Sequence, residues 1–295
     1  MSFADHDDDA APRSQGAGHE TNVLGASKNA PTVGSTGVIS PTLTWHGGPV
    51  MNTPTIYYIY YGNWNQPTGS DTAAGRQILE DFGHTIGGSP YFKINTTYKP
   101  SSGATISGNV SFGGTATDAY SQGTSLSDNG VLAVVNKALS TTLPYDPNGI
   151  YFVLTSSDVN ETSGFCTQYC GWHTAGTSTR GHVRYSFVGN ANRCLGSCSA
   201  QTVSPNGNAG VDGMISVLAH ELEETTTDPD LNSYYDRRGA ENGDKCAWTF
   251  GTSTALPSGA FYNVTLGAAG AGSTRNYLIQ RNLKFIGSSN YCTLN

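Results

Sequence analysis

The sequence is poor in charged residues and contains no long apolar run. Asp, Glu, Lys and Arg make up 13% of its 295 residues. No apolar stretch approaches the roughly 18 residues that a membrane-spanning helix needs. The 22 acidic residues outnumber the 15 basic ones, which gives a net charge of −7 at pH 7. This negative charge argues against a nucleic acid or an anionic membrane surface as the partner.

Several familiar signatures are also missing. The chain has no G-x-S-x-G, no P-loop and no dinucleotide-binding fingerprint. Its first residues, "MSFADHDDDAAPRS", lack the apolar segment of a signal peptide. Residues 1–40 are polar, aperiodic and rich in Gly, Ser and Asp. We therefore expect a flexible leader or pro-segment, followed by one domain over residues 41–295.

The residues that are abundant point to an exported protein. Gly, Ser, Thr, Asn and Tyr are frequent, a composition that favours a β-rich, loop-rich extracellular chain. Six cysteines are an even number, and two pairs have C-x3-C spacing rather than the C-x2-C spacing of zinc ribbons. Although six cysteines allow fifteen pairings, we favour three disulfides: Cys166–Cys170, Cys194–Cys198 and Cys246–Cys292.

Hydrophobic periodicity predicts a mixture of strands and helices. Runs rich in β-branched and aromatic residues predict strands within 55–64, 104–114, 149–159, 182–190 and 276–285. Helical spacing predicts helices over 71–86, with Asp71 as a possible N-cap, and over 125–139 and 211–226. Strands and helices alternate within one stretch, so we expect a single α/β or α+β domain with a mixed twisted sheet.

The third predicted helix carries the most informative motif, "HELEE" at 220–224. His220 and Glu224 are four residues apart and therefore share one helix face, with Glu221 next to His220. The H-E-x-x-H helices of zinc hydrolases use the same logic, with two ligands at i and i+4 and a general base at i+1. Glutamate in the second ligand position also binds zinc, or suits a harder ion such as Ca²⁺.

The alternative interpretation is an amphipathic helix with a solvated acidic face. The scarcity of glutamate weighs against it, because three of only seven glutamates fall in this turn. A third ligand is available about twenty residues downstream in "ENGDKC", where Asp244 or Glu241 would serve; His173 in "CGWH" is a rival. Asp228 and Asp230 could also bind a metal, but we interpret their segment "TDPD" as the end of the helix, which the proline at 229 enforces. We interpret His46 in "WHGGPVM" as structural.

These motifs resemble the EXORDIUM-like, or phosphate-induced protein, family, and the chain looks more like its microbial members. The matching segments, in the family's order, are "HGGPVM" (46–51), "YYGNW" (60–64), "FCTQYCGWH" (165–173), "VGNANRCLGSC" (188–198), "SPNGNAGVDGMISVLAHELEE" (204–224), "ENGDKC" (241–246) and "NYLIQ" (276–280). The resemblance implies a secreted or cell-wall protein that is linked in plants to growth. It supplies no reaction.

The chemistry of the residues suggests two functions. The first is a secreted zincin-like hydrolase, most plausibly a peptidase acting on an extracellular polypeptide. In it His220, Glu224 and Asp244 or Glu241 hold Zn²⁺, and Glu221 takes the proton of the attacking water. The second is a non-catalytic extracellular or cell-wall binding or structural protein, in which the same cluster holds a structural ion such as Ca²⁺, or none.

Overall fold

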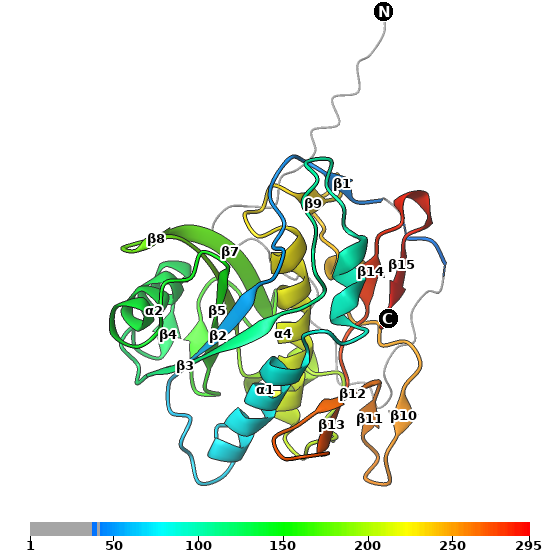
Figure 1. Ribbon diagram of the computed structural model, residues 1–295. Coiled ribbons are helices and arrows are strands. Elements are labelled where there is room, and N and C mark those ends of the chain that lie inside the picture. Colours follow the sequence, from blue (N-terminus) through cyan, green and yellow to red (C-terminus); the bar gives the residue numbers. More distant parts are fainter. Residues whose placement is uncertain (1–36, 40–41) are drawn as a thin grey trace, which may run out of the picture.

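A five-stranded sheet of mixed direction forms the centre of the molecule (Figure 1). The computed structural model describes residues 37–39 and 42–295. The strand order is β3 (Ser111–Asp118), β2 (Thr55–Tyr61), β5 (Gly149–Thr155), β8 (Gly181–Val188) and β7 (Gly171–Ser178). The first four strands are parallel, and β7 is an edge strand antiparallel to β8. The predicted α+β class and mixed, twisted sheet are confirmed.

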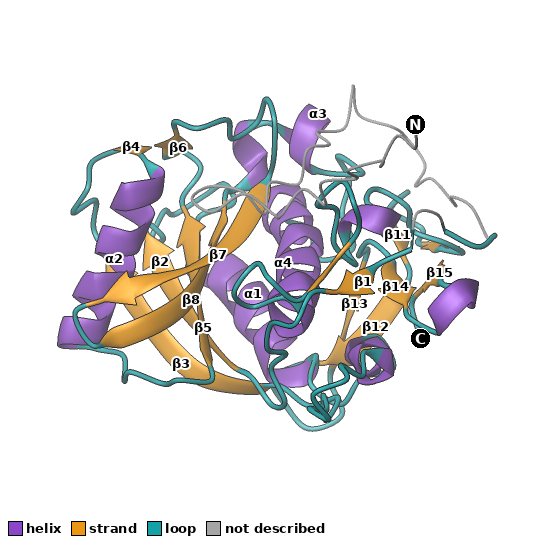
Figure 2. Cartoon of the chain, turned by 90° about the horizontal axis from the view of Figure 1, so that it is seen from above, coloured by secondary structure: helices purple, strands orange, loops and turns teal. Residues whose placement is uncertain are grey.

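Helices cover both faces of this sheet. They are α1 (Ala73–Thr85), α2 (Asp128–Thr141) and α4 (Ala209–Thr227), while the single turn α3 (Leu195–Cys198) packs against α4. Figure 2 shows α2 on one side of the sheet and α1 and α4 on the other. Strand β5 is consequently buried along its whole length, and β2 along all but its first residue. Such continuous burial is typical of parallel strands that are covered on both faces.

Short ribbons and 3₁₀ turns complete the described chain. The ribbons pair β1 (Thr44–Trp45) with β9 (Tyr234–Tyr235), β4 (Ser125–Leu126) with β6 (Asn160–Glu161), β10 (Thr254–Ala255) with β11 (Phe261–Tyr262), β12 (Val264–Gly267) with β13 (Thr274–Tyr277), and β14 (Asn282–Lys284) with β15 (Tyr291–Thr293). The 3₁₀ turns are η1 (Phe92–Thr97), η2 (Ala191–Arg193), η3 (Asp244–Cys246) and η4 (Gly287–Ser289).

The prediction of one strand over 276–285 is wrong, because this run changes partners. Tyr277 pairs with Val264 in β12, whereas Asn282 pairs with Thr293 in β15. Between the two strands, the backbone N–H of Gln280 donates to the side chain of Ser216 on α4 (3.2 Å). The hydrogen-bonding groups of this short connection are thus used outside any sheet.

The three longer helices lie close to their predicted positions, with one correction to a cap. Thr72, not Asp71, caps α1, and its hydroxyl accepts a hydrogen bond from the backbone N–H of Gly75 (3.0 Å). Asp71 instead accepts from the N–H and hydroxyl of Ser157, at 3.0 and 2.6 Å. Helix α4 ends at Asp228, its C-cap, directly before Pro229, as the sequence predicts.

All six cysteines are paired, but two of the three predicted pairs are wrong. Cys166–Cys170 and Cys194–Cys198 do not form; the bonds are Cys166–Cys194 and Cys170–Cys198, each with a sequence separation of 28. The two C-x3-C loops lie side by side, so each cysteine meets its counterpart in the other loop. Longer closed loops restrict the unfolded chain more strongly than loops of four residues. The third predicted bond, Cys246–Cys292, is present.

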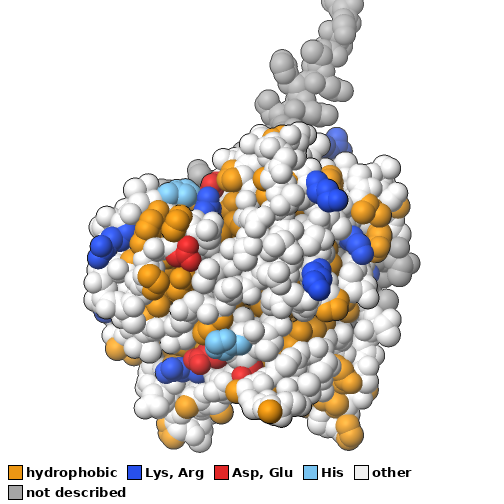
Figure 3. Space-filling model, viewed as in Figure 1, with side chains coloured by type: hydrophobic (Ala, Val, Ile, Leu, Met, Phe, Trp, Pro, Cys, Tyr) orange, Lys and Arg blue, Asp and Glu red, His pale blue; other side chains and the backbone are white. Residues whose placement is uncertain are grey.

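Charged side chains are few on the surface, and no helix among the described residues could span a membrane. None of the helices in the described ranges combines the length and apolarity that crossing a bilayer requires. On the face seen in Figure 3, charged side chains are sparse and separated. The predicted leader, residues 1–40, lies outside the described residues except for 37–39.

Candidate metal centre

Helix α4 is buried on every side, so the interpretation of a solvated acidic face is wrong. Each residue from Gly210 to Thr227 is buried. The predicted apolar stripe packs in the core: Val211, Met214, Ile215, Leu218 and Leu222. The polar side is equally covered, and His220, Glu221 and Glu224 are at most 1% exposed. Ionisable groups are costly to bury unless they are paired or bind a metal, and this face therefore requires partners.

The edge strand β7 supplies the first partner, His173. Its Nδ1 lies 3.2 Å from Oε2 of Glu221 and 3.5 Å from Oε2 of Glu224. The imidazole is fully buried. The sequence offered His173 only as a rival ligand, and the structure places it in the middle of the cluster.

The segment 241–246 supplies two further carboxylates. Oδ1 of Asp244 lies 3.7 Å from Nε2 of His220, which is itself 2.9 Å from Oε1 of Glu224. Oε1 of Glu241 faces Nε2 of His173 at 3.6 Å. The backbone N–H of Glu241 donates to Oδ2 of Asp244 (3.1 Å), which fixes the two acidic residues relative to each other.

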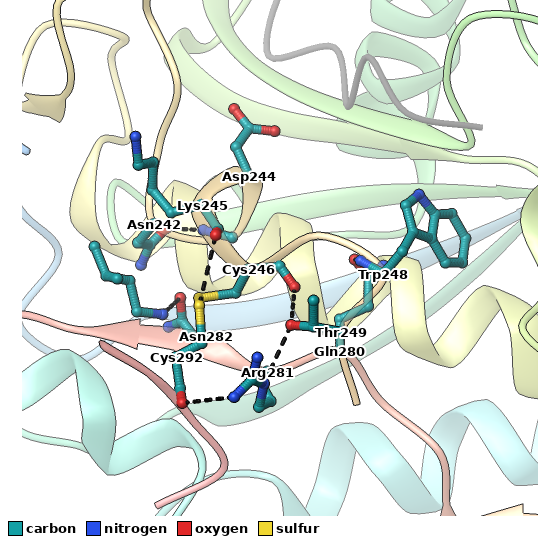
Figure 4. The surroundings of a disulfide bond; sticks show 12 residues. Asn242, Asp244, Lys245, Cys246, Trp248, Thr249, Gln280, Arg281, Asn282 and Cys292 are labelled. Carbon is teal, nitrogen blue, oxygen red and sulfur yellow. Dashed lines mark hydrogen bonds between the residues drawn. A yellow bond between two sulfur atoms is a disulfide. The ribbon is translucent and has the colours of Figure 1, made fainter. Parts of the chain in front are cut away.

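A disulfide anchors the segment 241–246 at its C-terminal end. Figure 4 shows Cys246 bonded to Cys292, with the carboxylate of Asp244 directed away from the sulfur atoms. Arg281 donates to the carbonyl of Cys292 (3.1 Å) and to the hydroxyl of Thr249 (3.1 Å), which in turn donates to the carbonyl of Cys246 (2.6 Å). The segment is therefore tied covalently and by hydrogen bonds to the C-terminal ribbon.

Two glycines allow the three elements to come together. A Cβ atom at Gly171 on β7 would lie 2.5 Å from a methyl of Val217 and 3.2 Å from Oε1 of Glu221. A Cβ atom at Gly243 would lie 2.9 Å from both Oε1 of Glu224 and Nε2 of His220. Real Cβ atoms do not approach other atoms below about 3 Å without displacement. Only glycine fits at these two points of close approach.

The electrostatics of the cluster show an excess of buried negative charge. Burial raises the pKa of Glu221 to about 8, although the hydrogen bond to His173 acts to lower it. Burial also raises the pKa of Glu241 well above its ordinary value. At Glu224, burial is outweighed by the charge of His220 and the hydrogen bonds with both histidines, which lower the pKa to about 2. Without a cation, protons on some carboxylates must balance this charge.

The donor set and its spacing fit a transition-metal ion. Two groups of three residues each offer one ligand atom, with all atoms of a group within 4.8 Å of one another: His173, Glu221 and Glu224, and His220, Glu224 and Asp244. Zinc ligands at 2.0–2.2 Å in tetrahedral geometry lie about 3.3 Å apart. The histidine–carboxylate distances of 2.9–3.7 Å bracket this value. Imidazole nitrogen suits zinc-class metals, whereas Ca²⁺ prefers six to eight oxygens.

Asp244 connects the cluster to an open pocket. Its side chain is 21% exposed, while the other members are at most 1% exposed. The pocket has a volume of about 530 Å³ and is lined by Val38, Ile39, Asp236, Arg238, Ala240, Asp244 and Lys245. A metal ligated by Asp244 would thus lie next to a space that solvent and small groups can enter.

The remaining predicted residues have structural roles, although Asp228 lies close enough to His173 and Glu241 to interact with them electrostatically. Asp228 accepts hydrogen bonds from the backbone N–H groups of Asn232 and Ser233 at 2.7 and 2.6 Å. Asp230 pairs with Arg184 at 2.8 Å, outside the cluster. The imidazole of His46 stacks on Tyr235 with ring centroids 3.5 Å apart, in agreement with the structural interpretation.

Sequence reasoning missed a role for a further buried acid on α4, Glu223. Oε2 of Glu223 accepts a hydrogen bond from the side chain of Asn282 (2.6 Å), and the carbonyl of Glu223 accepts from Asn242 (3.3 Å). Burial raises the pKa of Glu223 well above its ordinary value.

These features define a disulfide-bonded α+β protein with a buried histidine–carboxylate cluster. The chain belongs to the phosphate-induced protein 1 family, because the model of the "Phosphate-induced protein 1 conserved region" matches residues 43–286. The predicted resemblance is thereby confirmed.

Curated plant proteins are similar over much of the chain. Protein EXORDIUM-like 3 of Arabidopsis thaliana is 33% identical over 293 residues, covering 85% of this chain and 82% of the relative. Protein EXORDIUM-like 5 of the same plant is 30% identical and covers 71% of this chain and 65% of the relative. Protein PHOSPHATE-INDUCED 1 of Nicotiana tabacum is 35% identical over 39% of this chain and 41% of the relative. No solved structure matches the chain.

Proposed function

We propose that the protein is a secreted, non-catalytic protein that holds a metal ion and binds the cell wall or another extracellular component. A zinc-class cation at the cluster would fasten α4 to β7 and to the segment 241–246. One observation carries this proposal: two histidines and three carboxylates meet in a nearly dry interior at ligand spacing. Three disulfides support an oxidising, extracellular location.

The role of such an ion would be structural because it joins elements that are distant in the sequence. His173, Glu224 and Asp244 come from β7, α4 and η3. Metal that binds only the folded state stabilises that state by mass action. Removing the ion would leave the acidic residues of the cluster facing one another across the interior.

Metal analysis of the purified protein tests this proposal. We expect at least one equivalent of zinc, manganese or iron after dialysis, and a melting temperature that falls when a chelator removes it. His220→Ala should lower both metal content and melting temperature, whereas the matched change at the exposed His84 should alter neither. A metal-free protein whose melt is the same for wild type and His220→Ala would overturn the proposal.

A second candidate function, zincin-like hydrolysis of a polypeptide, is favoured by the pocket beside Asp244. A bound zinc ion would supply Lewis acidity and an activated water. Glu221 would hold the proton, and the pKa of about 8 that burial gives it suits a base that works near neutral pH.

The Glu221→Gln variant, assayed with dye-labelled casein, distinguishes the two functions. Casein hydrolysis by the wild type that disappears in a metal-loaded Glu221→Gln variant would establish the hydrolase. The absence of any metal-dependent casein hydrolysis by the wild type supports the non-catalytic function.

A further inference from the structure

Glu224 lies between two separate groups of ligand atoms. Its Oε1 is 2.9 Å from Nε2 of His220, and its Oε2 is 3.5 Å from Nδ1 of His173. Asp244 completes the first group, with Oδ1 3.7 Å from Nε2 of His220. Glu221 completes the second, with Oε2 3.2 Å from Nδ1 of His173. The two oxygens of one carboxylate thus face two different histidines.

The charge of the cluster matches two divalent ions rather than one. Histidines that ligate a metal are neutral. Once cations replace the protons on them, four carboxylates bring four negative charges into the site: Glu221, Glu224, Glu241 and Asp244. A single divalent cation leaves two of these charges uncompensated in an interior where unpaired charge is strongly destabilising. Two divalent cations balance them.

Buried atoms without partners identify the second group as a site in its own right. Within the described chain, Oε1 of Glu221, Nε2 of His173 and Oε1 of Glu241 have no hydrogen-bond partner, and all three residues are at most 1% exposed. Leaving such a group unsatisfied in the interior is destabilising. Glu221 and Glu241 lie on either side of the His173 imidazole, with Glu221 next to Nδ1, the nitrogen that would bind a cation, and Glu241 next to Nε2.

Glu241 has a distinct role in this arrangement. When Nδ1 of a histidine binds a metal, its Nε2 carries the hydrogen and donates it to a neighbouring carboxylate, which fixes the ring orientation. Nε2 of His173 points at Oε1 of Glu241 from 3.6 Å. In the metal-bound protein Glu241 would therefore accept from Nε2 of His173 and orient the ring, and Glu221 is left as a ligand.

We infer that the cluster is a two-cation centre bridged by Glu224, with His220 and Asp244 on the first ion and His173 and Glu221 on the second. The inference rests on the proposed metal-binding function and specifies its stoichiometry. It also assigns Glu221 to metal ligation, in contrast to the proton-accepting role that a hydrolase would require.

The experiment is a count of zinc ions per chain. Full-length protein is stripped with a chelator, reloaded with excess Zn²⁺, dialysed and analysed for zinc and protein. We expect two ions in the wild type, one each in Glu221→Gln and Asp244→Asn, and less than one in Glu224→Gln. The control Glu80→Gln changes a partly exposed acid on α1 that pairs with Arg76 and should retain two.

The outcomes separate this inference from the proposed function. One zinc ion in the wild type overturns the two-cation centre and leaves the metal-binding function intact. No zinc overturns both, and a Glu221→Gln variant that retains two ions overturns the assignment of Glu221.

A measurement on the wild type alone tests the inference even if the variants do not fold. Loading with Co²⁺ should give magnetic coupling between two ions in the electron paramagnetic resonance spectrum. The spectrum of an isolated ion at full loading would contradict the bridge through Glu224.

Discussion

Oε1 of Glu224 accepts a hydrogen bond from the backbone N–H of Asp244 at 3.0 Å. This contact joins the central helix to a segment that begins fourteen residues after the helix ends, at Glu241. The same oxygen lies 2.9 Å from Nε2 of His220. Glu224 therefore positions the candidate ligand Asp244 and is itself a candidate ligand.

Replacing Glu224 with glutamine or alanine separates these two roles. The amide oxygen of Glu224→Gln still accepts from Asp244 but is a poor ligand. We expect its zinc affinity to fall by more than about 100-fold, since loss of a partner that merely orients a ligand already costs 10–100-fold. Glu224→Ala should lose the same affinity and, in chelator, a further 1–3 kcal/mol of unfolding free energy, because the buried N–H is left unpaired. Competition with a zinc indicator and urea titration provide the measurements; equal stability of both apo variants would contradict the role of the hydrogen bond.

The Cys246–Cys292 bond should stabilise the fold and the metal centre together. Its loop spans 46 residues, for which removal of the bond costs about 3–4 kcal/mol of unfolding free energy. The double change Cys246→Ser with Cys292→Ser should also weaken zinc binding, because Glu241 and Asp244 lose their anchor. The matched control is Cys166→Ser with Cys194→Ser.

This control opens a loop of 28 residues that joins the two C-x3-C segments and does not include the segment 241–246. It should cost similar stability, measured by urea titration, yet leave zinc affinity unchanged. If both double variants weakened zinc binding equally, the link between the Cys246–Cys292 bond and the site would be wrong.

The sequence predicts the central helix and its motif because the relevant information is local. Periodic apolar residues from Val211 to Leu222 and the proline at 229 define α4 to within two residues at each end. The i, i+4 spacing then brings His220 and Glu224 together on one face. Periodicity alone cannot indicate that the opposite face is covered too, since that depends on the strand and loop that pack there.

The parts that were not predicted all depend on contacts between distant segments. The pairing of Cys166 with Cys194 depends on two loops lying side by side, and no local rule among fifteen pairings selects it. The position of His173 follows from β7 being the antiparallel edge of the sheet next to α4. Only the tertiary structure brings this histidine to Glu221.

Asp81 should make the free energy of unfolding depend on pH in the acidic range. Burial alone would raise its pKa, but hydrogen bonds from Arg275, Gln77 and the N–H of Ala269 lower the pKa below its ordinary value. A carboxyl with a lowered folded-state pKa stabilises the native state above the ordinary value of about 3.9, and this contribution is lost as the pH falls through the folded-state pKa.

Asp81→Asn tests this pH dependence. This substitution should lower the free energy of unfolding by about 2 kcal/mol at pH 6. The difference in unfolding free energy between the variant and the wild type should become smaller below pH 4. Urea unfolding of Asp81→Asn, Arg275→Gln and the double variant across this range would measure the coupling. A gap that widens toward acid would contradict the sign.

Gly243 should tolerate no side chain, because the cluster closes around it. A Cβ atom there would lie 2.9 Å from Oε1 of Glu224 and from Nε2 of His220. Gly243→Ala must therefore displace either the helix side chains or the segment that carries Asp244. Forcing an added methyl into a packed site costs about 1–3 kcal/mol, and zinc affinity should fall with it.

Gly130 on α2 provides the matched control for Gly243→Ala. A Cβ atom there meets its nearest neighbours at an ordinary 3.5 Å, and the residue lies in a helix. Gly130→Ala should therefore stabilise the protein by about 0.4–1 kcal/mol through the unfolded chain and leave zinc binding unchanged. Thermal melts with and without zinc compare the two variants. A Gly243→Ala protein that melts and binds zinc like the wild type would show that the segment 241–246 does not close on His220 and Glu224 as the structure describes.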